Sequence, residues 1–93
     1  MKAIWKNTIL AESNNTAGAD SEQYFPRGSV NTEFLRPSLT EGETDWKGTR
    51  SFYDVVVDEE VNPDAALFYS PAGPKAKDIE DMIAFGSCVE VVE

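Results

Sequence analysis

The segment from Thr49 to Asp58 constrains the fold more than any other part of the chain. Five of its residues have high β-propensity, namely Phe52, Tyr53, Val55, Val56 and Val57. Proline, glycine and asparagine residues separate it from shorter apolar segments, at the spacing typical of an all-β barrel or sandwich. We therefore expect a mainly β fold, a compact, strongly curved sheet or small barrel of about seven or eight short strands with one or two short helices.

The N-terminal part predicts a hairpin followed by a loop. Residues 2–13 form two short apolar segments around Lys6 and Asn7. Asparagine tolerates the left-handed backbone conformation that a two-residue hairpin requires. Residues 13–22 are small and polar, which is typical of a surface loop.

The strand at Thr49–Asp58 is expected to return on itself. Asp58–Glu60 predict a turn, and Val61 begins the returning segment. Asn62–Asp64 contain a proline and predict a break, after which residues 65–69 predict another strand.

Two short helices and a final strand pair complete the expected elements. Ser29 is a candidate N-cap for one or two helical turns that Pro37 ends. Apolar residues spaced three and four apart predict another short helix over 75–83. Residues 83–85 and 88–92 then predict two strands that pair around the glycine and serine between them.

Composition limits both the number of domains and the possible partners. The chain has 93 residues, which fits one domain spanning 1–93. Eight basic against 17 acidic residues give a net charge of −9. Because phosphate backbones and anionic membranes attract basic surfaces, we expect neither nucleic acid nor a membrane surface as a partner.

The absence of histidine and the single cysteine remove several chemistries. Without histidine there is no Ser-His-Asp triad and no histidine zinc site. Cys88 has no second cysteine for an intrachain disulfide and is expected to be a small buried strand residue. We expect no cofactor and a cytoplasmic location, since no secretory signal is visible.

Eight short motifs occur in order along the chain. They are Ala3-Ile4-Trp5, Leu10-Ala11-Glu12-Ser13, Tyr24-Phe25-Pro26, Ser29-Val30-Asn31, Trp46-Lys47-Gly48, Tyr53-Asp54-Val55-Val56-Val57, Asp64-Ala65-Ala66 and Ile83-Ala84-Phe85. In this order the chain resembles the small, mostly bacterial domain-of-unknown-function family 427, which carries a nucleotidyltransferase-like label. The resemblance implies a compact, strongly curved β-structure with minor helices and implies no catalytic mechanism. Many relatives have Cys-Pro before Trp-Lys-Gly, whereas this chain has Thr44-Asp45 there, so thiol chemistry at that place is not available.

Cationic residues beside an aromatic residue suggest an anion site. Lys47 and Arg50 follow Trp46 closely, and Arg36 precedes Pro37. Lysine supplies a point charge, arginine a bidentate fork and tryptophan a stacking surface. The alternative is a bulged strand corner with a buried Trp46 and an exposed Lys47, while Arg36 forms a surface salt bridge.

Three tyrosines are candidates for the rim of such a site. Tyr24, Tyr53 and Tyr69 each carry a hydroxyl that needs a partner when buried, and such residues often lie at the edge of a pocket. The alternative is ordinary packing beneath the strands.

Three acidic residues alternate along one predicted strand. Glu41, Glu43 and Asp45 would share a face and could hold Mg²⁺ or Ca²⁺ through their oxygens. The alternative is a solvated strand edge whose charges prevent aggregation.

These patterns leave three functional hypotheses. The first is a small anionic or polar ligand bound in a cleft lined by aromatic residues, lysine and arginine. The second is a non-enzymatic protein-interaction module, and the third is the nucleotidyl transfer that the family label suggests. Whether the chain is an enzyme stays open.

Overall fold

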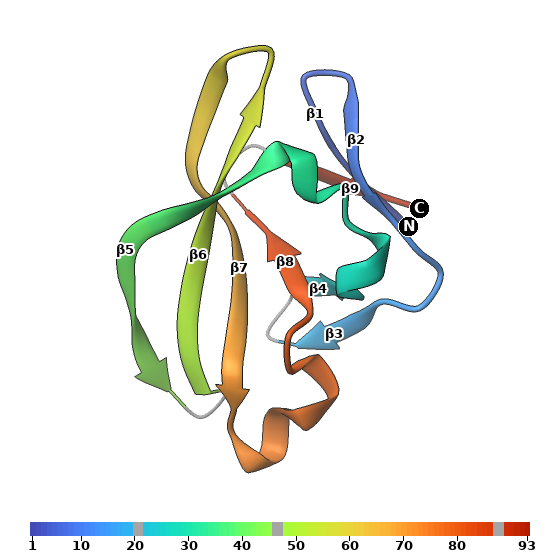
Figure 1. The fold of residues 1–93 in the computed structure, drawn as a ribbon. Helices are drawn as coiled ribbons and strands as arrows, with labels where there is room; N and C mark the ends of the chain where they lie inside the picture. Colours follow the sequence, from blue (N-terminus) through green and yellow to red (C-terminus); the bar gives the residue numbers. More distant parts are fainter. Residues whose placement is uncertain (20–21, 46–47, 87–88) are drawn as a thin grey trace.

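The computed structural model describes residues 1–19, 22–45, 48–86 and 89–93. Within them lie nine strands and three short 3-10 helices, with no longer helix (Figure 1). The strands are β1 (Lys2–Trp5), β2 (Thr8–Glu12), β3 (Ala17–Ala19), β4 (Glu22–Phe25), β5 (Leu35–Asp45), β6 (Gly48–Val57), β7 (Glu60–Ala72), β8 (Ile83–Phe85) and β9 (Glu90–Val92). The helices are η1 (Arg27–Ser29), η2 (Thr32–Phe34) and η3 (Pro74–Ile79). The predicted mainly β fold is confirmed, and no helix in these ranges is long and apolar enough to cross a membrane.

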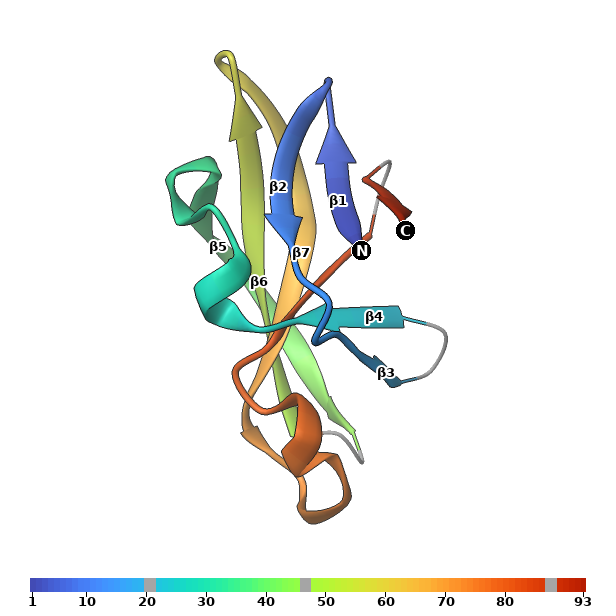
Figure 2. The same ribbon diagram turned by 90° about the vertical axis from the view of Figure 1, so that its right-hand side faces the viewer.

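The described strands form two antiparallel sheets. The smaller has the order β2-β1-β9 and the larger the order β3-β4-β8-β7-β6-β5. In neither sheet do the first and last strands pair, so the sheets are open and the predicted alternative of a small barrel is wrong. Figure 2 shows β3 and β4 running crosswise to β6 and β7, which is how the larger sheet curves so strongly.

Two tight hairpins confirm the predicted turns. Lys6 and Asn7 between β1 and β2 have φ values of 52° and 59°, and Asp58 and Glu59 between β6 and β7 have 50° and 68°. Two consecutive residues with positive φ are the signature of the type I′ turn, whose twist matches that of the strands. The hairpin tips lie side by side (Figure 1), and Lys6 Nζ lies 2.5 Å from Glu60 Oε2.

The predicted helices form only as 3-10 turns. Ser29 does not cap a helix, because its hydroxyl donates to the Pro26 carbonyl at 2.6 Å. Leu35 already begins β5, and Pro37 lies inside that strand, which is the edge of the larger sheet. A proline is tolerated there because an edge strand leaves backbone N–H groups unpaired.

The predicted strand pairing at the C-terminus is wrong. β8 pairs with β4 and β7 in the larger sheet, whereas β9 pairs with β1 in the smaller sheet. The predicted loop at 13–22 also contains a strand, since Ala17–Ala19 pair with Glu22–Tyr24. Cys88 lies outside the described residues.

Two apolar clusters lie on opposite faces of the larger sheet. The first joins the two sheets and contains Ala3, Leu10, Ala11, Phe25, Val30, Val55, Val57, Ala65, Ala66, Ile83 and Phe85. The second lies under η3 and contains Tyr24, Tyr69, Ala76, Ile79 and Ala84. Because successive side chains of a strand point to opposite faces of the sheet, neighbouring residues of β6 and β7 lie in different surroundings.

Candidate functional site

Strand β5 is longer than the stretch of β6 that it pairs with. Pro37 lies opposite Tyr53 and Glu41 opposite Ser51, so three residues of β5, 38–40, face Phe52 alone. A second shift follows, since Thr44 lies opposite Thr49. Extra residues in one strand of a pair must bow outward, and Figure 1 shows β5 curving away from β6.

Strand β7 carries a matching irregularity on the other side of β6. Asn62 lies opposite Val55 and Ala66 opposite Tyr53, so residues 63–65 face Asp54 alone. Asp64 has a φ of 54°, and its backbone N–H donates to Asp54 Oδ1 at 2.9 Å. The sequence predicted a break between two strands here, but the structure instead keeps β7 continuous through a bulge.

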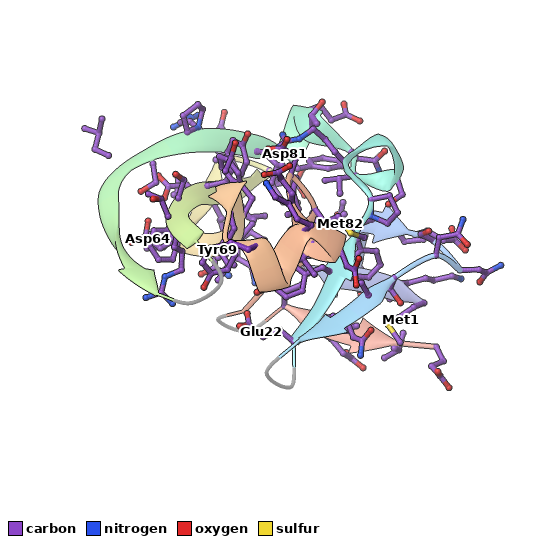
Figure 3. The ribbon with its side chains drawn as sticks, turned by 90° about the horizontal axis from the view of Figure 1, so that it is seen from below. Met1, Glu22, Asp64, Tyr69, Asp81 and Met82 are labelled. Atoms are coloured by element: carbon purple, nitrogen blue, oxygen red, sulfur yellow. The ribbon has the colours of Figure 1, made fainter. Side chains whose placement is uncertain are left out.

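Asp64 connects the two irregular strands across β6. Its Oδ1 accepts the Ser38 hydroxyl at 2.5 Å, and its Oδ2 accepts the Thr40 hydroxyl at 2.8 Å. The Ser38 oxygen in turn accepts the Thr40 backbone N–H at 3.0 Å. Figure 3 shows Asp64 inside the arc that β5 describes. The carboxylate therefore holds the bowed part of β5 in place.

A cleft lies between the bowed part of β5 and β6. We call it the β5–β6 cleft; its volume is about 350 Å³, and its lining residues are Ser38, Thr40, Gly42, Thr49, Arg50, Ser51 and Phe52. Four of these side chains carry a hydroxyl, one is cationic and one is aromatic. The volume is near the lower end of the range for small-molecule sites, ~300–1,000 Å³.

Arg50 is the cation of this cleft. Its Nε is buried and has no hydrogen-bond partner among the described residues. Its guanidinium carbon lies 5.4 Å from the centroid of the Phe52 ring, within the range of a cation–π contact. A buried polar atom without a partner costs about 1–3 kcal/mol, so a group that accepts from Arg50 would gain stability there.

Of the seven predicted site residues, Arg50 is the one that the described structure places in the cleft. Tyr24 and Tyr69 are fully buried under η3, with ring centroids 6.4 Å apart. Tyr69 is the cross-strand neighbour of Arg50, so their side chains leave the backbone on the same face of the sheet. Figure 3 shows Tyr69 beside the η3 segment, and its full burial excludes a place at an open rim.

Tyr53 belongs to a different environment, on the face of the first cluster. Its ring stacks on Phe68 with a centroid distance of 5.1 Å, and its hydroxyl accepts from Arg27 Nη1 at 3.1 Å. The Arg27 guanidinium carbon also lies 5.1 Å from the Phe68 ring centroid. Sequence reasoning missed this contact, because Arg27 and Tyr53 are distant in the chain and no local pattern joins them.

The remaining predicted residues lie apart or outside the described structure. Arg36 is exposed on β5, opposite Asp54 of β6. Trp46 and Lys47 lie outside the described residues, as do the side chains of Glu41, Glu43 and Asp45. The proposed cation site therefore stays a prediction, and the register shift between Glu41 and Thr44 interrupts the regular alternation of that strand.

The hydroxyl residues of the cleft were not predicted as site residues. Ser38 and Thr40 alternate on one strand and Thr49 and Ser51 on the next. Small hydroxyl residues at alternate positions on two adjacent segments, with an arginine between the second pair, form the signal that could have revealed them. The alternation alone would not have shown that the strands separate here.

The family to which the chain belongs follows from its match to a family model. The model described as a domain of unknown function (DUF427) matches residues 1–93. The chain therefore belongs to this family, as its ordered motifs predicted. A search of curated proteins found no match.

Proposed function

We propose that this member of the DUF427 family binds a small anionic or polar ligand in the β5–β6 cleft, with Arg50 as the anion contact. The observation that carries the proposal is the buried Nε of Arg50, which has no partner among the described residues and belongs to a side chain that lines the cleft. Arginine presents five donors in a planar fork, which matches the geometry of a carboxylate or a phosphate.

The rest of the lining supports a small ligand. Hydroxyl side chains on both strands offer further hydrogen bonds, and Phe52 offers an apolar surface. A few polar groups beside an apolar wall is the usual composition of a small-molecule site. Trp46 and Lys47, which lie between β5 and β6 in the sequence, stay predicted contributors to this site. Arg36, Tyr24, Tyr53 and Tyr69 do not line the cleft and are not part of this proposal.

An NMR titration tests the proposal. Phosphate, acetate and Mg·ATP would be added separately to ¹⁵N-labelled protein, and the amide shifts of Thr49, Ser51 and Phe52 would be followed. We expect saturable shifts at these residues for at least one anion, and we expect Arg50→Met to abolish them. Saturable binding of Mg·ATP alone would favour the nucleotidyl-transfer hypothesis.

Arg27→Met is the matched control. Arg27 also lies over aromatic rings, Tyr53 and Phe68, but it does not line the cleft. Its replacement should leave the titration unchanged. If no anion shifts the three amides, or if both variants bind as the unmodified protein does, the proposal fails.

A specific observation favours a second function, protein interaction at β5. Leu39 is 99% exposed on this strand, which forms an edge of the larger sheet. An extended peptide could add to such an edge, with Leu39 as an apolar contact. Affinity capture with the unmodified protein and with the Leu39→Asp variant would test this function. We expect at least one protein that the unmodified chain captures and the variant does not; if the two captured sets are the same, this function is excluded.

A further inference from the structure

We infer that the ligand of the β5–β6 cleft carries an oxyanion at one end and a hydrogen-bond donor, an ammonium or hydroxyl group, at the other, as small amino acids and hydroxy acids do. This inference rests on the proposed function and narrows its ligand to a chemical class. It follows from the direction of the hydrogen bonds that surround the cleft.

At one end of the cleft, the hydroxyl protons of Ser38 and Thr40 already form hydrogen bonds with Asp64. A carboxylate can only accept, so in both contacts with Asp64 the hydroxyl is the donor. Ser38 and Thr40 each have a single hydroxyl proton, and each gives it to Asp64. Toward a ligand, therefore, both hydroxyls can act only as acceptors.

The acceptor capacity of these two hydroxyls is not exhausted. A hydroxyl oxygen has two lone pairs. Ser38 uses one for the Thr40 backbone N–H, and the described residues give no donor to the Thr40 oxygen. Three lone pairs thus remain, on two side chains that line the cleft and are polarised by a negative charge behind them.

The other part of the cleft lining, at Arg50, offers hydrogen-bond donors instead of acceptors. The guanidinium of Arg50 can only donate, and its Nε has no acceptor among the described residues. Arg50 and Phe52 are two residues apart on β6, and the bowed segment that contains Ser38 and Thr40 lies opposite Phe52. At about 3.4 Å per residue, the backbone of Arg50 lies ~7 Å along β6 from that of Phe52, and the Arg50 guanidinium reaches back to 5.4 Å from the centroid of the Phe52 ring.

A ligand with oxyanions at both ends fits this arrangement poorly. Its second anion would meet lone pairs and the Asp64 carboxylate, which repel it. Thr40 is exposed and Ser38 partly so, so a ligand with an apolar second end would displace water from these acceptors without replacing its hydrogen bonds. A donor at that end would bond to Ser38 or Thr40, and a hydrogen bond strengthened by charge corresponds to roughly tenfold or more in affinity.

Two isosteric series of acids test the inference. The short series is isobutyrate, lactate and alanine, and the long series is pentanoate, 4-hydroxybutyrate and 4-aminobutyrate. Within each series the carboxylate is the same, and a methyl group is replaced by a hydroxyl or an ammonium group. NMR titration should show a member with a donor binding at least tenfold more tightly than its methyl analogue in one of the series.

The results separate the inference from the proposed function. If the methyl analogue binds through Arg50 as tightly as the donor-bearing acids in both series, the inference fails and the proposed function stands. If none of the six acids binds, and phosphate, acetate and Mg·ATP do not bind either, both fail. If only phosphate, acetate or Mg·ATP binds, the inference alone fails.

Asp64→Asn provides a second test, because it changes the direction of a hydrogen bond. The new amide can donate to one of the two hydroxyls and so release its proton toward the cleft. The preference for donor-bearing acids should then fall severalfold, while binding of the methyl analogue is kept or improved. An unchanged preference in a folded Asp64→Asn protein overturns the inference.

Thr40→Val and Thr8→Val form a matched pair of variants. Thr40→Val removes one of the acceptors and should reduce the preference for donor-bearing acids. Thr8 also bonds through its hydroxyl, to the Lys6 carbonyl at 3.3 Å, but it does not line the cleft, so Thr8→Val should leave the preference unchanged. Equal preferences in the two variants contradict the inference.

Discussion

Gly42 lies so close to Arg50 that a side chain at residue 42 would overlap the Arg50 carbonyl oxygen and stand 2.9 Å from both its carbonyl carbon and its Cβ. The nearest atoms are backbone of β6, which cannot move aside without breaking its pairing with β7. Gly42 thus lets β5 return to β6 after the bowed segment, and it sets the width of the β5–β6 cleft at that end.

Gly42→Ala should therefore destabilise the fold and weaken ligand binding. We expect a loss of about 1–3 kcal/mol in the free energy of unfolding, as for overpacked positions generally. Urea unfolding followed by tryptophan fluorescence would measure it. Gly28→Ala is the control, since nothing lies within 4 Å of a Cβ there, and its effect should be within ~0.5 kcal/mol. Equal effects of the two substitutions would contradict this account of Gly42.

The Asp64 contacts predict a graded series of substitutions. Asp64→Ala loses the bonds to Ser38 and Thr40 and also places alanine at a positive φ. Asp64→Gly loses the same bonds but accommodates the backbone conformation. We expect Asp64→Ala to be less stable than Asp64→Gly by about 1–2 kcal/mol, the cost of the left-handed conformation for a residue with a Cβ.

Chemical denaturation of both Asp64 variants, beside the unmodified protein, measures this difference. The NMR signals of residues 38–40 would report separately whether the bowed part of β5 stays in place. Identical stabilities of the alanine and glycine variants would show that the positive φ of Asp64 contributes nothing.

The ion pair between the hairpin tips should contribute little and should depend on salt. The Lys6 and Glu60 side chains are 38% and 61% exposed, so water and ions screen their attraction. A double-mutant cycle with Lys6→Gln and Glu60→Gln should give a coupling energy of about 0.2–1 kcal/mol that falls as salt is added. A coupling of several kcal/mol, or one that salt does not change, would be inconsistent with this exposure.

Tyr69 is expected to act in packing. Its side chain is fully buried in the cluster under η3, beside Tyr24. Tyr69→Ala should cost ~3–5 kcal/mol, which is the range for large aromatic residues in a core. Thermal unfolding would measure the loss. Tyr53→Phe is a milder comparison: it removes only the acceptor for Arg27 and should cost about 0.5–2 kcal/mol.

Local turns were the most predictable part of the fold. Asn7 tolerates the left-handed conformation of its turn, the acidic residues at 58–60 interrupt the apolar pattern, and both hairpins form as expected. The strand at Thr49–Asp58 was equally predictable, because β-branched and aromatic residues fill most of it.

Features that depend on distant partners were not predictable. Residues 62–64 resemble a strand break, but the bulge there is held by Asp54 and by hydroxyls 24 and 26 residues earlier in the chain. The final strands join different sheets: β9 pairs with β1, and β8 pairs with β4 as well as with the preceding strand β7. The partners β1 and β4 are remote in sequence, and no local pattern indicates them. The cleft exists through the mismatch in length between β5 and β6, which no local motif encodes.

The pairing of β1 with β9 has a consequence for the order of folding. Lys2 lies opposite Val92 and Ile4 opposite Glu90, so the smaller sheet joins the two extremes of the described chain. Such contacts close a long loop and are formed late, because their entropic cost must be met first. During synthesis, the β1–β2 hairpin can form early, yet one side of β1 keeps unpaired N–H and C=O groups until residues 90–92 emerge. Over that interval β1 is an open strand edge, the part of a nascent β-protein most exposed to pairing with another chain.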